Sequence, residues 1–298
     1  MNNLQELLNT LHGRRRLARS GMATRCRLAC RCITGGRAAV IVARNREEFN
    51  AARGLAGLFS AELSLGDTPP ERPRWMSPIV TLPPGALHLG PGTAWPDRMA
   101  TLFALRRNSA RCLIVTPDNL LTRFMPGNFF DEHELTLSIG MELSPELLTE
   151  QAVEWGFERG QMATRPGDLA RRGDILDIYP PGYERPVRLE FFGDVIEEMR
   201  LFDPGTQRSL CTMQEMTLLP VTPVSTSRFW RKKARERWER LFQKGLLDED
   251  SLGSLKRDLD RGGHGILPGC FYDASTVLEE WLPKDTLWLL PGEADIKE

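Results

Sequence analysis

The sequence predicts an α/β protein in which a parallel-sheet domain is interrupted by an inserted α+β domain built on an antiparallel sheet. Apolar runs alternate with segments of helical spacing near the N-terminus, as they do in parallel sheets. The middle of the chain changes to short strand-like segments separated by turn residues. Residues 285–290 then add a last apolar run, which needs a parallel sheet to join. We therefore expect residues 1–133 and 220–298 to form one discontinuous domain around an insertion at residues 134–219.

The first domain is expected to contain two strands that are buried on both faces. Residues 37–43 and 112–116 are continuous apolar runs, which is the pattern of strands covered by helices on either side. Apolar residues at helical spacing follow the first run, and a second helical stretch at residues 98–106 precedes the other. The stretch 66–96 is rich in proline and glycine and predicts a long irregular connection at the surface.

The inserted domain is expected to contain one helix and a set of antiparallel strands. Ser144 and Pro145 are a helix cap and a proline at the first helical position, and Gly156 is suited to end the helix. Gly193-Asp194 lies between two strand-like runs and fits a two-residue type II′ hairpin. The expected strands are residues 134–139, 174–179, 187–192 and 195–202.

Basic residues crowd two parts of the chain, residues 14–37 and 228–244. Residues 229–243 are amphipathic, with one apolar stripe and arginine or lysine elsewhere, as in a surface helix. Each basic segment fits either the solvated face of a helix or a surface that contacts phosphate groups. The sequence leaves both interpretations open, so a weak contact with DNA stays among the expectations.

The composition excludes several functional classes. The 298 residues carry a net charge of −1, so no field of the whole molecule favours nucleic acid. No apolar run approaches the length of a membrane span and no signal sequence is evident, which predicts a cytoplasmic protein with no membrane contact. The cysteines lack the paired spacing of a zinc site and are expected to be reduced thiols. We expect no metal and no cofactor.

The segment where such a domain would bind nucleotide phosphates is degenerate. No G-x4-G-K-[ST] motif occurs in the sequence. The nearest stretch contains Ser20, Gly21, Thr24 and Arg25, with threonine where the phosphate-binding lysine would stand. The planar guanidinium of Arg25 has a different geometry from a compact ammonium group and does not replace it. The sequence therefore predicts a degenerate nucleotide loop and no nucleotide hydrolysis.

One strand of the inserted domain, residues 187–192, has an unusual outward face. Side chains alternate along a strand, so its valine, leucine and first phenylalanine are expected to face the core. Arg188, Glu190 and Phe192 are then expected on the opposite face. A phenylalanine beside an arginine on a solvated face is typical of an interface anchor. The Arg171-Arg172 pair is expected to add a second guanidinium to the same edge.

Two interpretations of this face follow from the sequence. In the first, Arg188 and Phe192 bind a partner protein, and the arginine forks favour a partner rich in carboxylates. In the second, Phe192 covers the end of the hairpin against Val195, and Arg188 pairs with Glu190 or Glu197. The alternation of side chains alone does not choose between them.

Three segments of the inserted domain carry a recognisable pattern. They are Arg-Gly-Asp-Ile-Leu-Asp-Ile-Tyr-Pro at residues 172–180, Arg-Leu-Glu-Phe-Phe-Gly-Asp at residues 188–194 and Phe-Asp-Pro-Gly-Thr-Gln-Arg-Ser at residues 202–209. Together they resemble the UvrA-binding module that is shared by UvrB and the bacterial transcription-repair coupling factors. The Thr-Gln-Arg-Ser ending favours the coupling factors, as does the absence of the aromatic-rich hairpin that UvrB threads through DNA. Weaker similarity extends from residue 15 to residue 292.

The resemblance implies an adaptor that binds UvrA and recruits nucleotide excision repair to stalled RNA polymerase. It implies a helicase-like domain that has lost its nucleotide site, and UvrA contacts at Arg172, Arg188 and Phe192. Polymerase-binding and translocase domains have no counterpart in this sequence, so contact with RNA polymerase is expected only through domains that it lacks. The alternatives are a fragment of a divergent UvrB- or helicase-type ATP-dependent DNA enzyme, and a DNA-binding module that uses the basic helices.

Overall fold

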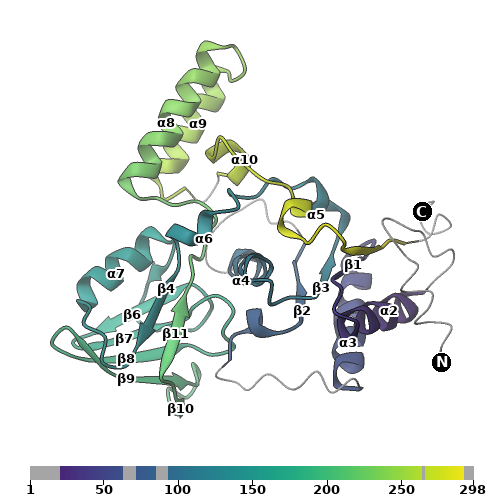
Figure 1. Ribbon diagram of the computed structural model, residues 1–298. Helices are drawn as coiled ribbons and strands as arrows, with labels where there is room; N and C mark the ends of the chain where they lie inside the picture. The colour runs from purple at the N-terminus through teal and green to yellow at the C-terminus, as the bar shows by residue number, and fades with distance from the viewer. Residues whose placement is uncertain (1–20, 63–71, 85–92, 264–265, 292–298) are drawn as a thin grey trace.

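The computed structural model describes residues 21–62, 72–84, 93–263 and 266–291. These residues form a mixed α/β structure with three sheets: a four-stranded parallel sheet, a six-stranded sheet that is antiparallel except for one pair, and a two-stranded antiparallel sheet. The two larger sheets lie on opposite sides of the molecule (Figure 1). An α/β structure with both parallel and antiparallel sheets is therefore observed, as predicted.

The parallel sheet is covered on both faces, as its apolar runs predict. Its elements are α2 (Met22–Thr34), β1 (Ala39–Val42), α3 (Arg46–Glu62), β2 (Ile79–Thr81), α4 (Trp95–Arg106), β3 (Cys112–Val115) and β12 (Leu287–Leu289), and the strand order is β12-β1-β3-β2. Ile41 and Ile114 pack with α2 and α3, whereas Val40 and Leu113 share a core with α4. The last strand pairs in parallel with β1, so two distant segments of the chain build this sheet.

The prediction of an irregular connection at residues 66–96 is wrong in part. Within it, Arg74–Met76 form a short 3-10 helix, η1, that buries Trp75 between two aromatic rings, and β2 adds an edge strand to the parallel sheet. The strand escapes prediction because it is only three residues long and follows a proline, so it has no apolar run of its own. Residues 63–71 and 85–92 lie outside the described residues.

The six-stranded sheet has one apolar and one polar face. Its strand order is β10-β9-β8-β7-β6-β5, with β5 (Glu158–Arg159), β6 (Asp168–Arg172), β7 (Ile175–Ile178), β8 (Val187–Phe192), β9 (Val195–Phe202) and β10 (Ser209–Thr212). The inner face shares a core with α7 (Pro145–Glu154), the helix that was expected after Ser144. Along β8, Val187, Leu189 and Phe191 are buried, as the alternation predicts. Strands β5, β6 and β10 were not predicted.

Two short turns of the same sequence end two strands of this sheet. Arg172 pairs with Ile175 across Gly173-Asp174, and Phe192 pairs with Val195 across Gly193-Asp194. Each glycine adopts a φ of +60° and neither aspartate has a positive φ, which excludes a type I′ turn and agrees with the predicted type II′. Strands β6 and β8 both run antiparallel to β7, so the two turns lie at the same end of the sheet.

The remaining elements connect the sheets and extend from them. Helices α8 and α9 form a hairpin that projects from the rest of the molecule (Figure 1). Strands β4 and β11 pair with each other. Among the described residues, no helix has the length and apolar character needed to cross a membrane. The bounds are β4 (Leu135–Ser138), β11 (Glu215–Leu218), α5 (Pro117–Leu121), α6 (Phe129–Glu132), α8 (Arg228–Gln243), α9 (Glu249–Asp260), α10 (Pro268–Phe271) and η2 (Leu278–Trp281).

Candidate partner-binding face

The polar face of the six-stranded sheet carries two rows of charged side chains. Strand register places Asp177 beside Arg188, and Arg200 next to Arg188 on the following strand. The neighbouring row contains Arg172, Glu190 and Glu198, which are aligned across the strands through Ile175. Because directly paired residues point to the same face of a sheet, the charges form a grid on one surface. Its members are Arg172, Asp177, Arg188, Glu190, Glu198 and Arg200.

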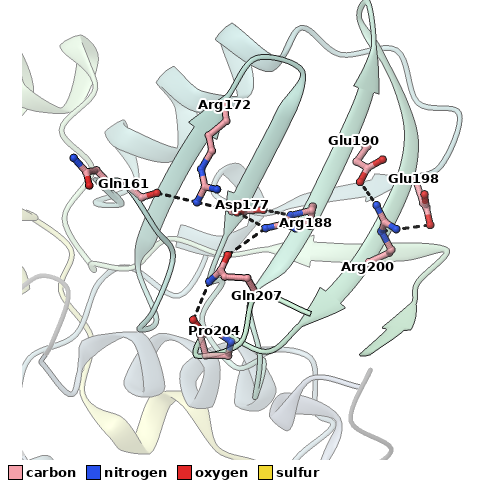
Figure 2. Close-up of polar contacts among 9 residues, drawn as sticks. All are labelled: Gln161, Arg172, Asp177, Arg188, Glu190, Glu198, Arg200, Pro204 and Gln207. Carbon is pink, nitrogen blue, oxygen red and sulfur yellow. Dashed lines mark hydrogen bonds and ion pairs between the residues drawn. The ribbon is translucent and has the colours of Figure 1, made fainter. Parts of the chain in front are cut away.

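Arg188 is held by several groups of the protein itself. Its Nε and Nη2 donate to the two carboxylate oxygens of Asp177 at 2.7 and 2.8 Å, and Nη2 also donates to the side-chain oxygen of Gln207 at 3.3 Å (Figure 2). The guanidinium lies over the ring of Phe202 at 4.7 Å from its centre. The hydrogen bond to Asp177 raises the pKa of Arg188. These contacts leave the Arg188 side chain only 17% exposed and that of Asp177 only 2% exposed.

The second interpretation of this face pairs Arg188 with Glu190 or Glu197, and that pairing is wrong. Arg188 is paired across the sheet with Asp177, whereas Glu190 accepts a hydrogen bond from Arg200. Glu190 lies two residues along the same strand from Arg188, whereas Asp177 lies directly opposite on the neighbouring strand. Directly opposite residues are closer than residues two apart along a strand, so Arg188 pairs with Asp177.

Phe192 and Arg172 are the open members of the predicted set. Phe192 is 78% exposed although it pairs across the hairpin with Val195, so the hairpin end leaves most of this residue in solvent. The Arg172 side chain is 53% exposed. Its Nη2 donates to the carbonyl oxygen of Gln161 at 3.0 Å and lies 4.0 Å from Asp177 (Figure 2).

The structure thus places all three predicted residues on one face, with different exposures and contacts. Arg172 and Arg188 meet at Asp177, which the sequence analysis did not single out. Phe192 stands at the end of β8, beside the turn that lies at the same end of the sheet as the one following Arg172. Gln207 was also missed. Its only local signal is its place in the Thr-Gln-Arg-Ser ending, and that signal does not show which residue it contacts.

Comparison with known proteins relates the segment that contains this face to a known protein family. Residues 135–223 match the family model described as the UvrB interaction domain. The chain is 32% identical over 210 residues to the transcription-repair-coupling factor of Myxococcus xanthus and 33% identical over 204 residues to that of Escherichia coli (strain K12). The predicted resemblance to the transcription-repair coupling factors is confirmed. Each match covers 67% of this chain but only 16% and 17% of those relatives.

The chain is also similar to a UvrB-type protein. The chain is 26% identical over 158 residues to the UvrABC system protein B of Pseudothermotoga lettingae, which covers 53% of this chain and 24% of that protein. The chain thus spans a small part of the length of the coupling factors and UvrB-type proteins that it matches.

Three of the four residues predicted to form a degenerate nucleotide loop lie among the described residues, at the start of α2. Gly21 precedes α2 as its N-terminal cap, and Thr24 is exposed on the first turn. Arg25 is buried: its Nη1 donates to the carbonyl oxygen of Val42 at 2.8 Å, and its Nη2 lies 3.5 Å from Glu48. Ser20 lies outside the described residues. The guanidinium of Arg25 therefore fastens α2 to the end of β1.

Most arginines of the basic helix α8 form ion pairs with other parts of the molecule. Arg231 and Arg235 contact Asp260 of α9, and Arg237 and Arg240 contact Asp273. These pairs agree with the interpretation of α8 as the solvated face of a helix. The other basic segment, residues 14–37, lies partly outside the described residues. Within the described ranges, no cluster of His, Cys, Asp or Glu is arranged to hold a metal ion.

Proposed function

We propose that this chain is an adaptor that binds UvrA through the polar face of its six-stranded sheet and so recruits nucleotide excision repair to stalled RNA polymerase. One observation carries the proposal. Within the segment that matches the UvrB interaction domain, the sheet leaves Phe192 and Arg172 exposed on the same face as the clamped Arg188. An exposed aromatic ring that shares one face of a sheet with two arginines has the composition of an interface hot spot.

The three side chains are given different tasks in this proposal. Phe192 is the apolar anchor, because an exposed phenylalanine gains most from burial in a pocket of the partner. Arg172 is the mobile donor, since one hydrogen bond to a carbonyl oxygen leaves most of its guanidinium in solvent. Arg188 is the fixed donor, oriented before the partner arrives.

We also assign the parallel-sheet domain a supporting role without nucleotide hydrolysis. The position next to the missing lysine is occupied by Arg25, whose guanidinium is committed to Val42 and Glu48. In this proposal residues 1–133 and 220–298 form a helicase-like domain with a degenerate nucleotide loop, and residues 134–219 form the inserted UvrA-binding domain. Any contact with RNA polymerase is made by other domains of the assembled coupling factor.

The test is a calorimetric titration of UvrA with the purified chain and two phenylalanine variants. Phe192→Ala should weaken binding about thirtyfold, or about 2 kcal/mol, which is the usual loss at an aromatic hot spot. Phe229→Ala is the matched control, because Phe229 is also exposed but lies on α8. No binding by the unaltered chain, or equal losses in both variants, would overturn the proposal.

The two alternative functions are tested with the same material. A functional nucleotide site would show ATP binding in a titration, and we expect none. A DNA-binding module would bind duplex DNA with an affinity that falls steeply with salt. Substantial DNA binding without UvrA binding would favour the DNA-binding alternative over the adaptor.

A further inference from the structure

We propose that Asp177, assisted by Gln207, is a positioning residue of the UvrA-binding face that holds Arg188 in a single orientation and leaves only Nη1 for the partner. The inference rests on the proposed function and deepens it, because it names residues that act through Arg188. Both residues lie beside Arg188 in Figure 2, Asp177 on the neighbouring strand and Gln207 on the loop between β9 and β10.

Asp177 is a buried carboxylate on a face that is otherwise open. Its side chain is 2% exposed, yet it lies between Arg172 and Arg188, whose side chains reach solvent. Both of its oxygens accept hydrogen bonds from Arg188, and Arg172 approaches the same carboxylate at 4.0 Å. Burying a charged carboxylate is costly unless it is paired, so its place here depends on the two arginines and fixes where they point.

Gln207 is held in a backbone conformation that few residues other than glycine adopt. Its φ is +61°, in the left-handed region, which only one other described non-glycine residue enters. The carboxylate of Asp203 fixes the loop before it by accepting hydrogen bonds from the backbone of Gly205 and Thr206. The amide nitrogen of Gln207 then donates to the carbonyl oxygen of Pro204, which turns its amide oxygen toward Arg188. Strained backbone of this kind is often found at functional sites.

The hydrogen bonds of Arg188 leave one defined end of the guanidinium unused. The N–H of Nε and both N–H groups of Nη2 have acceptors in Asp177 and Gln207. Nη1 has no acceptor within the described part of the chain. Since the stacked ring of Phe202 and the Asp177 carboxylate prevent rotation, Nη1 is presented in one direction. An oriented donor loses less rotational freedom on binding than a free arginine side chain.

The first test is Asp177→Asn, with Asp260→Asn as its matched control. Each change removes one negative charge from an arginine–aspartate pair, but Asp260 pairs with Arg231 on the α8–α9 hairpin and not on the six-stranded sheet. If charge alone mattered, an acidic partner would bind both variants more tightly. If Asp177 positions Arg188, then Asp177→Asn should weaken UvrA binding about tenfold through the freed side chain, while Asp260→Asn should not weaken it.

A second set of measurements separates positioning from a loss of structure. Asp177→Asn in the Arg188→Ala background should cause no further loss of affinity, because its effect passes through Arg188. Gln207→Asn keeps a side chain that tolerates a positive φ but is too short to reach Arg188, and should weaken binding about twofold to threefold. In a ¹⁵N-labelled chain, the slowly exchanging Nε–H signal of Arg188 should be lost in Asp177→Asn while the backbone spectrum is retained.

The outcomes distinguish this inference from the function on which it rests. If the unaltered chain does not bind UvrA, the proposed function fails. If it binds, and Phe192→Ala weakens binding while Asp177→Asn and Gln207→Asn do not, only the positioning role is wrong. An additive loss for Asp177→Asn in the Arg188→Ala background would likewise contradict it.

Discussion

The parallel sheet and the six-stranded sheet of this chain use their two faces differently. Every residue of β1 and β3 is buried, because helices cover both sides of the parallel sheet. The six-stranded sheet has an apolar face in the core and a charged face toward solvent. A sheet that is covered on both sides offers no surface to a partner, whereas a sheet that is covered on one side offers a flat and rigid one. The difference explains where we place the binding function.

Two arginines show the same contrast at the level of single residues. Arg25 of α2, next to the parallel sheet, is buried and donates to the carbonyl oxygen of Val42, so its contacts are internal. Arg188 of the other sheet is clamped by a carboxylate, but its Nη1 has no acceptor among the described residues. A wholly buried guanidinium holds elements of the fold together. A guanidinium whose Nε and Nη2 are bonded to the protein presents its Nη1 in one direction.

The charged face is balanced rather than basic. Arg172, Arg188 and Arg200 stand beside Asp177, Glu190 and Glu198, so the six side chains carry no net charge. Net charge on this face therefore does not favour a partner rich in carboxylates. In the proposed function, binding instead depends on the direction in which each guanidinium points, which is why we expect the Asp177 clamp on Arg188 to affect it.

The largest effect is expected in the covered sheet. Leu113→Ala removes a buried side chain from β3 and should lower the free energy of unfolding by about 4 kcal/mol through the lost contacts and the cavity. Affinity for UvrA per folded molecule should stay unchanged. Urea denaturation and titration measure the two quantities. A variant that keeps its stability but loses UvrA binding would break the comparison between the sheets.

The next effect concerns the clamped pair on the open sheet. Arg188→Ala leaves the carboxylate of Asp177 buried and unpaired, which should lower the free energy of unfolding by about 3 kcal/mol and also weaken UvrA binding. Combining Asp177→Leu with Arg188→Met should restore most of the stability, since apolar residues of similar size replace the pair, but not the binding. A stability unaffected by Arg188→Ala would show that the pair is not buried in solution.

A smaller effect is expected at the exposed end of the same row. Arg172→Ala should leave the free energy of unfolding within about 0.5 kcal/mol of its original value, because its side chain is half exposed. It should weaken UvrA binding about fivefold, through loss of one partly solvated charged contact. Arg53→Ala on α3 is the matched control, as Arg53 is an exposed arginine of the covered sheet's domain. Equal binding losses at both positions would show that arginine number matters more than position.

The smallest effect concerns pH. His133 is buried and stacks on Phe129, whose carbonyl oxygen contacts Nδ1 at 2.8 Å. Burial lowers the pKa of His133 below its ordinary value of 6.5, against smaller opposing effects of that contact and of Glu132. The unfolded chain then binds more protons near and just below pH 6.5, so stability should be complete above that pH and fall as the pH decreases. His133→Gln should flatten this part of the curve in urea denaturation between pH 5 and pH 8, whereas an unchanged slope would exclude His133 as its source.

Much of this arrangement follows from local patterns in the sequence. The apolar runs at residues 37–43, 112–116 and 285–290 predict strands that are buried on both faces, and they become β1, β3 and β12. Alternation along residues 187–192 predicts which side chains of β8 face outward. Periodicity is a property of neighbouring residues, so one sequence is enough to detect it.

The clamp on Arg188 does not follow from the sequence, because it depends on register between strands. Strands β7 and β8 are joined by residues 179–186, and no tight turn fixes their alignment. A shift of the pairing would place another residue beside Arg188 instead of Asp177. Gln207 is less predictable still, since its contact requires a left-handed backbone at a residue other than glycine.

The most direct test of the central claim is hydroxyl-radical footprinting of the chain with and without UvrA. Phe192 and Phe229 are both exposed, one on the open face of the six-stranded sheet and one on α8, so they report on two different surfaces in one experiment. The account predicts that UvrA protects Phe192 from oxidation and leaves Phe229 as reactive as before. Protection of Phe229 with an unchanged Phe192 would contradict it.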